Sequence, residues 1–347
     1  MSTENPVSAA SPVSTPRLIA DRTYRNYDGP LRTVRAGWWV IAQAVVRTNI
    51  KKVGFWMPLL MIVLIHLFFG LFFFLNHNVT RAIGDIGGGG GGGGRGFGRG
   101  QGVFTYAACC YLCVTESWLM VFIEALIIGA GCIAADNQAN ALLVYLSRPL
   151  SKLDYLVGKW FGVFSLLWCI SAIPTLLIYV FLLTSYYDEG FWTQNPYLLP
   201  RLFMATLIAP MLNASLVVGF SAWSKGGRQA GASFASLYFI VGVFTLISGN
   251  ILAKNAMTEI DNETPGAKMA LARAMTIRDA SVGGVTDGLA MNLLHVKPQD
   301  HPFQFAPQSR RLVPPLTWPL VALGAAFVVL PLAAAHRKIR AVEIISG

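Results

Sequence analysis

Residues 53–75 read VGFWMPLLMIVLIHLFFGLFFFL, a run that contains no Asp, Glu, Lys or Arg. A helix needs about 20 apolar residues to cross the hydrocarbon core of a bilayer, and this run supplies them without interruption. Backbone N–H and C=O groups inside lipid have to be paired within the spanning structure, and a helix pairs them all. The stretch therefore predicts a transmembrane helix.

Five further stretches have the same character: 118–135, 160–184, 202–223, 230–252 and 316–335. Residues 103–114, just before the first of these, are also largely apolar. None of the stretches alternates with a period of two, so a membrane β-barrel is disfavoured. We expect an all-α integral membrane protein with six transmembrane helices, in a transmembrane domain over residues 53–337.

The composition excludes a soluble enzyme. Hydrophobic residues make up 54% of the 347 positions, charged residues only 13%, and the mean hydropathy is +0.53, whereas a soluble domain averages about 25% charged residues. The net charge of +10 comes from basic residues that flank apolar runs. That placement is typical of orientation signals and lipid headgroup contacts rather than of nucleic-acid binding.

Charge placement also predicts the topology. The first 52 residues carry eight basic residues against three acidic ones, and Arg337, Lys338 and Arg340 follow the last apolar run. Excess Lys and Arg marks the cytoplasmic side, and six spans place both termini there. We expect a bacterial cytoplasmic (inner) membrane protein with a cytoplasmic tail over 338–347 and outer loops over 76–115 and 253–315.

The segment before the first span divides in two. Residues 1–30 begin with a Ser-, Pro- and Thr-rich stretch and are expected to form a disordered cytoplasmic tail. Residues 31–52 place Trp38, Trp39, Ile41 and Val45 between basic residues, which predicts an amphipathic helix at the membrane interface. A helix packed against a partner is an equally good interpretation and does not exclude the first.

The outer loops contain two features. Residues 87–94 are all glycine, but no Gly-Lys-Ser/Thr follows them and no apolar strand precedes them, so a phosphate-binding loop is excluded and a flexible linker is favoured. Residues 253–315 carry seven basic and six acidic residues. Within them, residues 268–278 have helical spacing, and we expect a small cap over the outer mouth.

The loop over residues 136–159, between the second and third spans, is the most informative stretch: DNQANALLVYLSRPLSKLDYLVGK. Asp136 or Asn137 can cap a short helix, and residues 142–146 form a compact apolar surface that Pro149 ends. Ser151 and Asp154 have the spacing of a capping box for the next helix. An apolar surface on a cytoplasmic loop requires a covering partner.

This loop resembles that of the type-2 (ABC-2) ABC transporter permease family at Leu146, Ser147, Arg148 and Pro149, and then at Tyr155, Leu156, Gly158 and Lys159. The resemblance extends more loosely over residues 30–340. It implies a coupling helix that inserts into a groove on a separate ATPase subunit, made by Leu142, Leu143, Tyr145, Leu146, Ser147, Arg148 and Pro149. It also implies that this chain holds no cofactor and that the ATPase binds ATP and Mg.

Two ionisable residues lie inside predicted spans, Glu124 and His66. An ionised carboxylate at that depth is costly, so Glu124 is expected to be protonated, paired or next to a wet cavity. A structural hydrogen bond between helices is favoured somewhat over the handling of substrate or protons. His66 is a candidate partner for Glu124, although a buried and satisfied histidine is the better interpretation.

Cys109, Cys110 and Cys113 lie close together near the outer end of the second span. A metal site or a disulfide is conceivable, but no second Cys-x-x-Cys completes a zinc set. We expect these residues to serve packing, with Cys132 and Cys169 inert in their spans. No metal site and no catalytic constellation is predicted.

The sequence thus predicts the permease subunit of an ATP-driven exporter, which is not itself an enzyme. Its expected partners are ATPase subunits, a second copy or a related permease, the lipid bilayer and an extracytoplasmic protein, and nucleic acid is not among them. Two alternatives remain open. The chain could be a mechanotransmitting subunit that acts on an extracytoplasmic partner, or an ion-coupled secondary transporter, although no inverted repeat supports the latter.

Overall fold

The computed structural model describes residues 37–86, 105–139, 151–261, 265–296 and 314–339, and those residues are helical with no strand among them. The helices are α1 (Gly37–Ile50), α2 (Val53–Ile86), α3 (Tyr106–Glu124), η1 (Ala125–Gly129), α4 (Ala134–Gln138), α6 (Lys152–Ser185), α7 (Phe191–Gln194), α8 (Leu198–Trp223), α9 (Gly227–Asp261), α10 (Ala267–Arg278), α11 (Val282–Leu293) and α12 (Thr317–Lys338).

Six of these segments are long and apolar enough to cross a membrane: Val53–Val79, Tyr106–Gln138, Lys152–Ser185, Leu198–Trp223, Gly227–Ile260 and Thr317–Lys338. Each contains one of the six apolar stretches found in the sequence, so the predicted all-α fold with six transmembrane helices is confirmed. Most of the helices begin or end several residues beyond the apolar run. Their polar ends continue the backbone hydrogen bonding where hydropathy no longer indicates a span.

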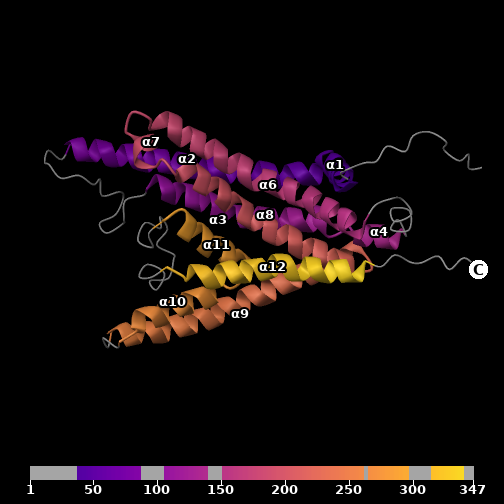
Figure 1. Ribbon diagram of the computed structural model, residues 1–347. Coiled ribbons are helices and arrows are strands. Elements are labelled where there is room, and N and C mark those ends of the chain that lie inside the picture. The colour runs from indigo at the N-terminus through magenta and orange to yellow at the C-terminus, as the bar shows by residue number, and fades with distance from the viewer. Residues whose placement is uncertain (1–36, 87–104, 140–150, 262–264, 297–313, 340–347) are drawn as a thin grey trace, which may run out of the picture. The chain divides into compact units, whose positions relative to one another are not determined.

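α8 lies at the centre of the bundle. Of its most apolar window 72% is buried, against 22% for α9 and 17% for α12. Its buried positions include the small residues Ala205, Ala209, Ala214 and Gly219, which allow neighbouring helices to approach closely. α6 and α12 lie along it in Figure 1, where α9 departs from the bundle together with α10. The outward faces of α9, α12 and α2 are left for lipid or another subunit.

α1 forms the contact with α6 that defines one end of the bundle, called the α1 end below. Two glycines one helical turn apart on α6 make this contact possible. A Cβ added to Gly158 would lie 2.5 Å from the Trp38 carbonyl oxygen, and one added to Gly162 would lie 2.7 Å from Cβ of Val45. A small-xxx-small pair of this kind brings two helix backbones together, so α1 is fixed to the start of α6.

At the other end, called the α7 end, α9 and α10 pack against each other. Ala253 and Ala256 of α9 and Leu271, Ala274 and Met275 of α10 form a small separate apolar core. α10 confirms the helix that the sequence predicts over residues 268–278. α11 was not predicted, because its glycines weaken the helical signal; in the structure it packs against α8, α12 and α3.

The connection between α6 and α7 is tied to α2 through Glu189. Nε2 of His77 lies 2.9 Å from Oε2 of Glu189, and the Tyr106 hydroxyl donates to the same oxygen at 3.4 Å. The His77 ring lies edge-on to Tyr186 with 4.6 Å between ring centroids. Burial, with Tyr106 and Glu189 nearby, raises the pKa of Tyr186 to about 12. This cluster holds the α7 ends of α2, α3 and α6 together.

Candidate functional site

All of the residues predicted to couple to an ATPase lie outside the described residues: Leu142, Leu143, Tyr145, Leu146, Ser147, Arg148 and Pro149. The structure instead defines both ends of the loop that carries them. One end is α4, the last helix of the second span, and the other is the first turn of α6. The candidate site is therefore built from these two ends and from the elements that hold them.

The start of α6 is capped as the sequence predicts. The Ser151 hydroxyl accepts a hydrogen bond from the Asp154 backbone N–H at 3.0 Å, and the Ser151 backbone N–H donates to Oδ2 of Asp154 at 3.2 Å. This reciprocal capping box satisfies two N–H groups that the helix leaves unpaired. It fixes the residue at which the loop ends and the transmembrane helix begins.

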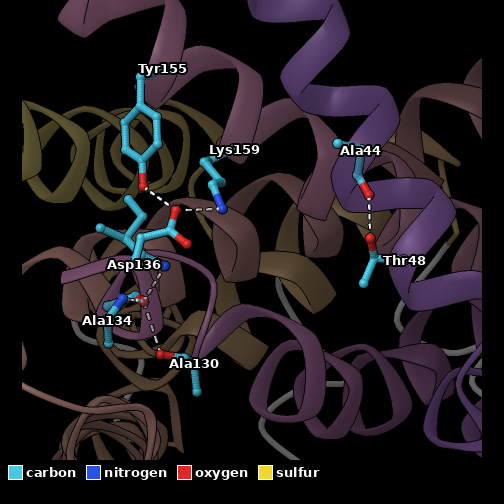
Figure 2. A network of polar contacts seen from close by, with 9 residues as sticks. Ala44, Thr48, Ala130, Ala134, Asp136, Tyr155 and Lys159 are labelled. Carbon is cyan, nitrogen blue, oxygen red and sulfur yellow. Dashed lines mark hydrogen bonds and ion pairs between the residues drawn. The ribbon is translucent and has the colours of Figure 1, made fainter. Parts of the chain in front are cut away.

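The two ends of the loop meet at Asp136. Its Oδ2 accepts a hydrogen bond from the Tyr155 hydroxyl at 2.6 Å and lies 2.8 Å from Nζ of Lys159. Figure 2 shows the tyrosine and the lysine converging on this carboxylate. Tyr155 and Lys159 are one turn apart on α6 and therefore share a face. We call Asp136, Tyr155 and Lys159 the loop clamp.

The loop clamp is largely shielded from solvent, with 19% of the Asp136 side chain and 11% of the Lys159 side chain exposed. The lysine ammonium also lies 5.7 Å from the centre of the Tyr155 ring. Asp136 lies inside α4, so its carboxylate joins two helices instead of capping one. Because ion pairs shielded from water are weakly screened, the clamp ties α4 to α6 at the point where the loop leaves the bundle.

A break in the second span leads into α4. α3 ends at Glu124, the chain continues as the π-helical segment η1, and a turn follows before α4 begins. The Ser221 hydroxyl of α8 bridges this turn: it accepts from the backbone N–H groups of Ile133 (3.0 Å) and Ala134 (2.9 Å) and donates to the Ala130 carbonyl (2.9 Å). Figure 2 shows Ala130 and Ala134 near Asp136.

α8 also approaches η1 closely, because a Cβ added to Gly129 would overlap the Val217 side chain. The loop base is thus connected to three elements. The loop clamp joins it to α6, and Ser221 joins it to the central helix α8. α6 in turn packs against α1 at Gly158 and Gly162. These contacts link the described ends of the loop to α1, α6 and α8. We call the loop clamp, Ser221, Gly158 and Gly162 together the coupling base.

The structure separates the two intramembrane residues that the sequence singled out. Nε2 of His66 lies 3.2 Å from the Thr175 hydroxyl oxygen. Both oxygens of Glu124 are buried without a hydrogen-bond partner in the described part of the chain. The hypothesis that His66 pairs with Glu124 is wrong, because His66 is held by α6. His66 is buried as expected, but it is only half satisfied, because its Nδ1 has no hydrogen-bond partner among the described residues.

The cysteines fill space in the structure. Cys109, Cys110 and Cys113 are fully buried in the apolar cluster at the α7 end and their thiols are free. Cys132 and Cys169 are also free and partly buried. Within the described ranges, no group of three His, Cys, Asp or Glu side chains has the geometry of a metal site.

Sequence reasoning missed three parts of the coupling base. Tyr155 and Lys159 entered only as part of the family motif, and their shared partner Asp136 could not be assigned. Gly158 and Gly162 form a G-x-x-x-G motif, which can be recognised from the sequence alone. The role of Ser221 had no sequence signal, because a serine inside an apolar helix is common. The shared faces of Tyr155 with Lys159 and of Gly158 with Gly162 follow from helical spacing, whereas the partner of each pair does not.

Comparison with known protein families finds a match. Residues 39–336 match the family described as ABC-2 family transporter protein. The matched region begins in α1 and ends in α12, so it contains the whole coupling base and all six spans. No curated protein matches the chain.

Proposed function

Because this chain belongs to the ABC-2 transporter family, which matches residues 39–336, we propose that it is the permease subunit of an ATP-driven exporter. It is a multi-pass membrane protein of a family whose members are non-catalytic membrane subunits of ABC transporters. We further propose that a separate ATPase binds ATP and Mg, docks on residues 142–149, and drives movement of a substrate out of the cytoplasm.

The observation that carries this proposal is the coupling base. A loop that only connects two spans needs no clamp, whereas here an ion pair, a tyrosine hydroxyl and a serine bridge fix both of its ends. Force applied to the loop by a partner would reach α6 through Lys159 and Tyr155, and α8 through Ser221. Closure of an ATPase dimer around ATP would supply that force, and the spans would convert it into access for the substrate.

The charges at the α1 end support a cytoplasmic position for that end. Arg47, Lys51, Lys52, Lys225 and Arg228 are all exposed there, as the positive-inside rule requires of a cytoplasmic surface. We propose that α1 lies at the inner leaflet, that both termini are cytoplasmic, and that the membrane is the bacterial inner membrane. We also propose that two permeases assemble, because the outward faces of α2, α9 and α12 are apolar.

One observation favours a second function, that of a mechanotransmitting subunit. α9 has 35 residues, which corresponds to a length of about 52 Å, whereas the hydrocarbon core measures about 30 Å. The far end of α9 and its partner α10 therefore project beyond the α7 side of the bilayer. Such a helical pair offers a surface to an extracytoplasmic protein. Transport by the reconstituted complex would distinguish export from mechanical work alone.

The test replaces Leu142, Leu143 and Leu146 together with serine. Burial of each leucine at a partner surface contributes about 1.5–3 kcal/mol, so the triple variant should lose its ATPase during purification or fail to stimulate ATP turnover. The matched control replaces the same three residues with methionine, which keeps the apolar volume and should keep the ATPase bound. Wild-type retention and turnover in a correctly inserted serine variant would contradict the proposal.

A further inference from the structure

Glu124 is the one carboxylate of the described spans that is completely buried, with 0% of its surface exposed. Neither Oε1 nor Oε2 has a hydrogen-bond partner among the described residues. A side chain of the neighbouring helix α8 also has a buried polar atom without a hydrogen-bond partner. Asn213 of α8 is 1% exposed, its amide nitrogen donates to the Ala209 carbonyl at 2.8 Å, and its Oδ1 has no partner in the described residues.

The register of α3 and α8 places these two side chains at the same depth. Gly129 of η1 meets Val217, and Ile133 in the turn after η1 meets Ser221, so the second span runs parallel to α8 with an offset of 217 − 129 = 221 − 133 = 88 residues. Glu124 therefore corresponds to position 212, next to Asn213. Asn213 precedes Val217 by four residues and shares its face of α8. Glu124 precedes Gly129 by five residues, the hydrogen-bond spacing of a π-helix, so the two residues lie on the same side of the segment.

The atoms of Glu124 and Asn213 that have no hydrogen-bond partner among the described residues are all acceptors. Two carboxylate oxygens and one amide oxygen are all acceptors, and a buried polar atom without a partner is costly. A proton on the carboxyl group supplies the missing donor and removes a charge that the membrane interior does not tolerate. We propose that Glu124 is an intramembrane proton-binding site, in which the protonated carboxyl group donates its hydrogen bond to Oδ1 of Asn213.

Most titratable groups on the surrounding helices are engaged elsewhere or lie far along the helix axis, whereas Nδ1 of His66 and the Tyr238 hydroxyl have no hydrogen-bond partner among the described residues. His66 of α2 bonds Thr175, Lys159 of α6 pairs with Asp136, and Asp287 of α11 accepts from Tyr111. Arg201 of α8 lies over Tyr197 at the α7 end. Tyr238 of α9 packs on Phe122, which points to a different side of α3 from Glu124. None of them donates a hydrogen bond to Glu124, whose two carboxyl oxygens have no partner among the described residues, so its proton comes from water.

The π-helical segment links this site to the coupling base. Glu124 directly precedes η1, and the other end of η1 leads into the turn held by Ser221 and into Asp136. Moving the extra residue of a π-segment along a helix turns the residues it passes by about 100°, one residue of an α-helix. A displaced loop would therefore rotate Glu124 relative to α8, break its contact with Asn213, and release its proton to water wherever the new position is hydrated.

The experiment uses the purified full-length chain in lipid nanodiscs, without ATP or an ATPase, and infrared spectroscopy at neutral pH. A protonated carboxylic acid has a C=O stretching band separate from those of carboxylates and amides. We expect wild type to show this band and Glu124→Gln to lose it. Glu116→Gln, an exposed glutamate on the same helix, should keep it, and Asn213→Ala should shift it.

An unchanged carboxylic-acid region in Glu124→Gln, with loss from the carboxylate region, would overturn the proposal. If Glu124→Gln does not fold, Glu124→Asp and Asn213→Ala test the proposal instead, and both should shift the carboxylic-acid band. If neither variant shifts the band, the band does not belong to Glu124 and the proposal is wrong. Because no ATPase takes part, failure of this test leaves the proposed export function standing. Loss of ATPase docking by the leucine variant would likewise leave the proton site standing.

Discussion

Asp136 uses one carboxylate oxygen for two partners, the Tyr155 hydroxyl at 2.6 Å and the Lys159 ammonium at 2.8 Å. These partners contribute unequally. Removing the hydroxyl loses a single charge-assisted hydrogen bond, about 1.5–3 kcal/mol. Removing the ammonium leaves a shielded carboxylate without its counter-charge, which in buried pairs is destabilising by about 3–5 kcal/mol. At the scale of single residues, Lys159 is therefore the stronger half of the loop clamp.

Lys159→Met should lower stability by about 2–4 kcal/mol, below the fully buried limit because both side chains keep some exposure, and Tyr155→Phe should lower it by less. The measurement is the apparent Tm of each variant in nanodiscs. Lys225→Met is the control, since Lys225 is exposed. In Asp136→Leu with Lys159→Met, part of the loss should return. Equal Tm values for the Lys159 and Lys225 variants would show that the clamp contributes nothing.

At the scale of elements, the break between α3 and α4 depends on Ser221, whose hydroxyl satisfies two N–H groups and one carbonyl. Ser221→Ala leaves two buried donors without a partner, each at about 1–3 kcal/mol. We expect faster amide hydrogen exchange at Ile133 and Ala134, measured by mass spectrometry, while α9 is unchanged. Ser221→Thr keeps a hydroxyl, so its exchange rates at Ile133 and Ala134 should stay near those of wild type. Exchange as fast in Ser221→Thr as in Ser221→Ala would contradict the serine bridge.

The contact between α1 and α6 gives a second prediction at this scale. Gly158→Val places side-chain atoms where the Trp38 carbonyl lies, so α1 should separate from α6. The distance between spin labels on Thr48 and Leu153, both exposed, should change from a narrow distribution to a broad one. Gly242→Val is the control, because a Cβ at Gly242 meets nothing within 4 Å. A narrow distribution in Gly158→Val would refute the close packing.

The same elements show what the sequence could and could not predict. The six spans follow from apolar length alone, and the capping box of Ser151 and Asp154 and helix α10 follow from local spacing. The loop clamp, the Ser221 bridge and the π-segment depend on which helix lies beside which. Asp136 and Lys159 are separated by 22 residues of sequence, 159 − 136 − 1, and no local rule pairs them. The pairing of His66 with Glu124 failed for the same reason.

At the scale of the whole molecule, the two ends of the bundle differ in charge. Lys and Arg gather at the α1 end, whereas the α7 end holds Asp188 and Glu189 between α6 and α7. Only one orientation in the membrane agrees with the positive-inside rule. We propose that orientation, in which the coupling base lies in the cytoplasm, where ATP is available, and α7 and α10 lie outside.

Cysteine labelling of intact cells tests this orientation. In a background with the five native cysteines replaced by alanine, a membrane-impermeant maleimide should label Thr193→Cys in α7 and Met269→Cys in α10, both exposed positions. Lys225→Cys, between α8 and α9, should react only after the cells are permeabilised. The reverse pattern would place residues 142–149 outside the cell. No cytoplasmic ATPase could then reach the loop, and the export proposal would fail together with the topology.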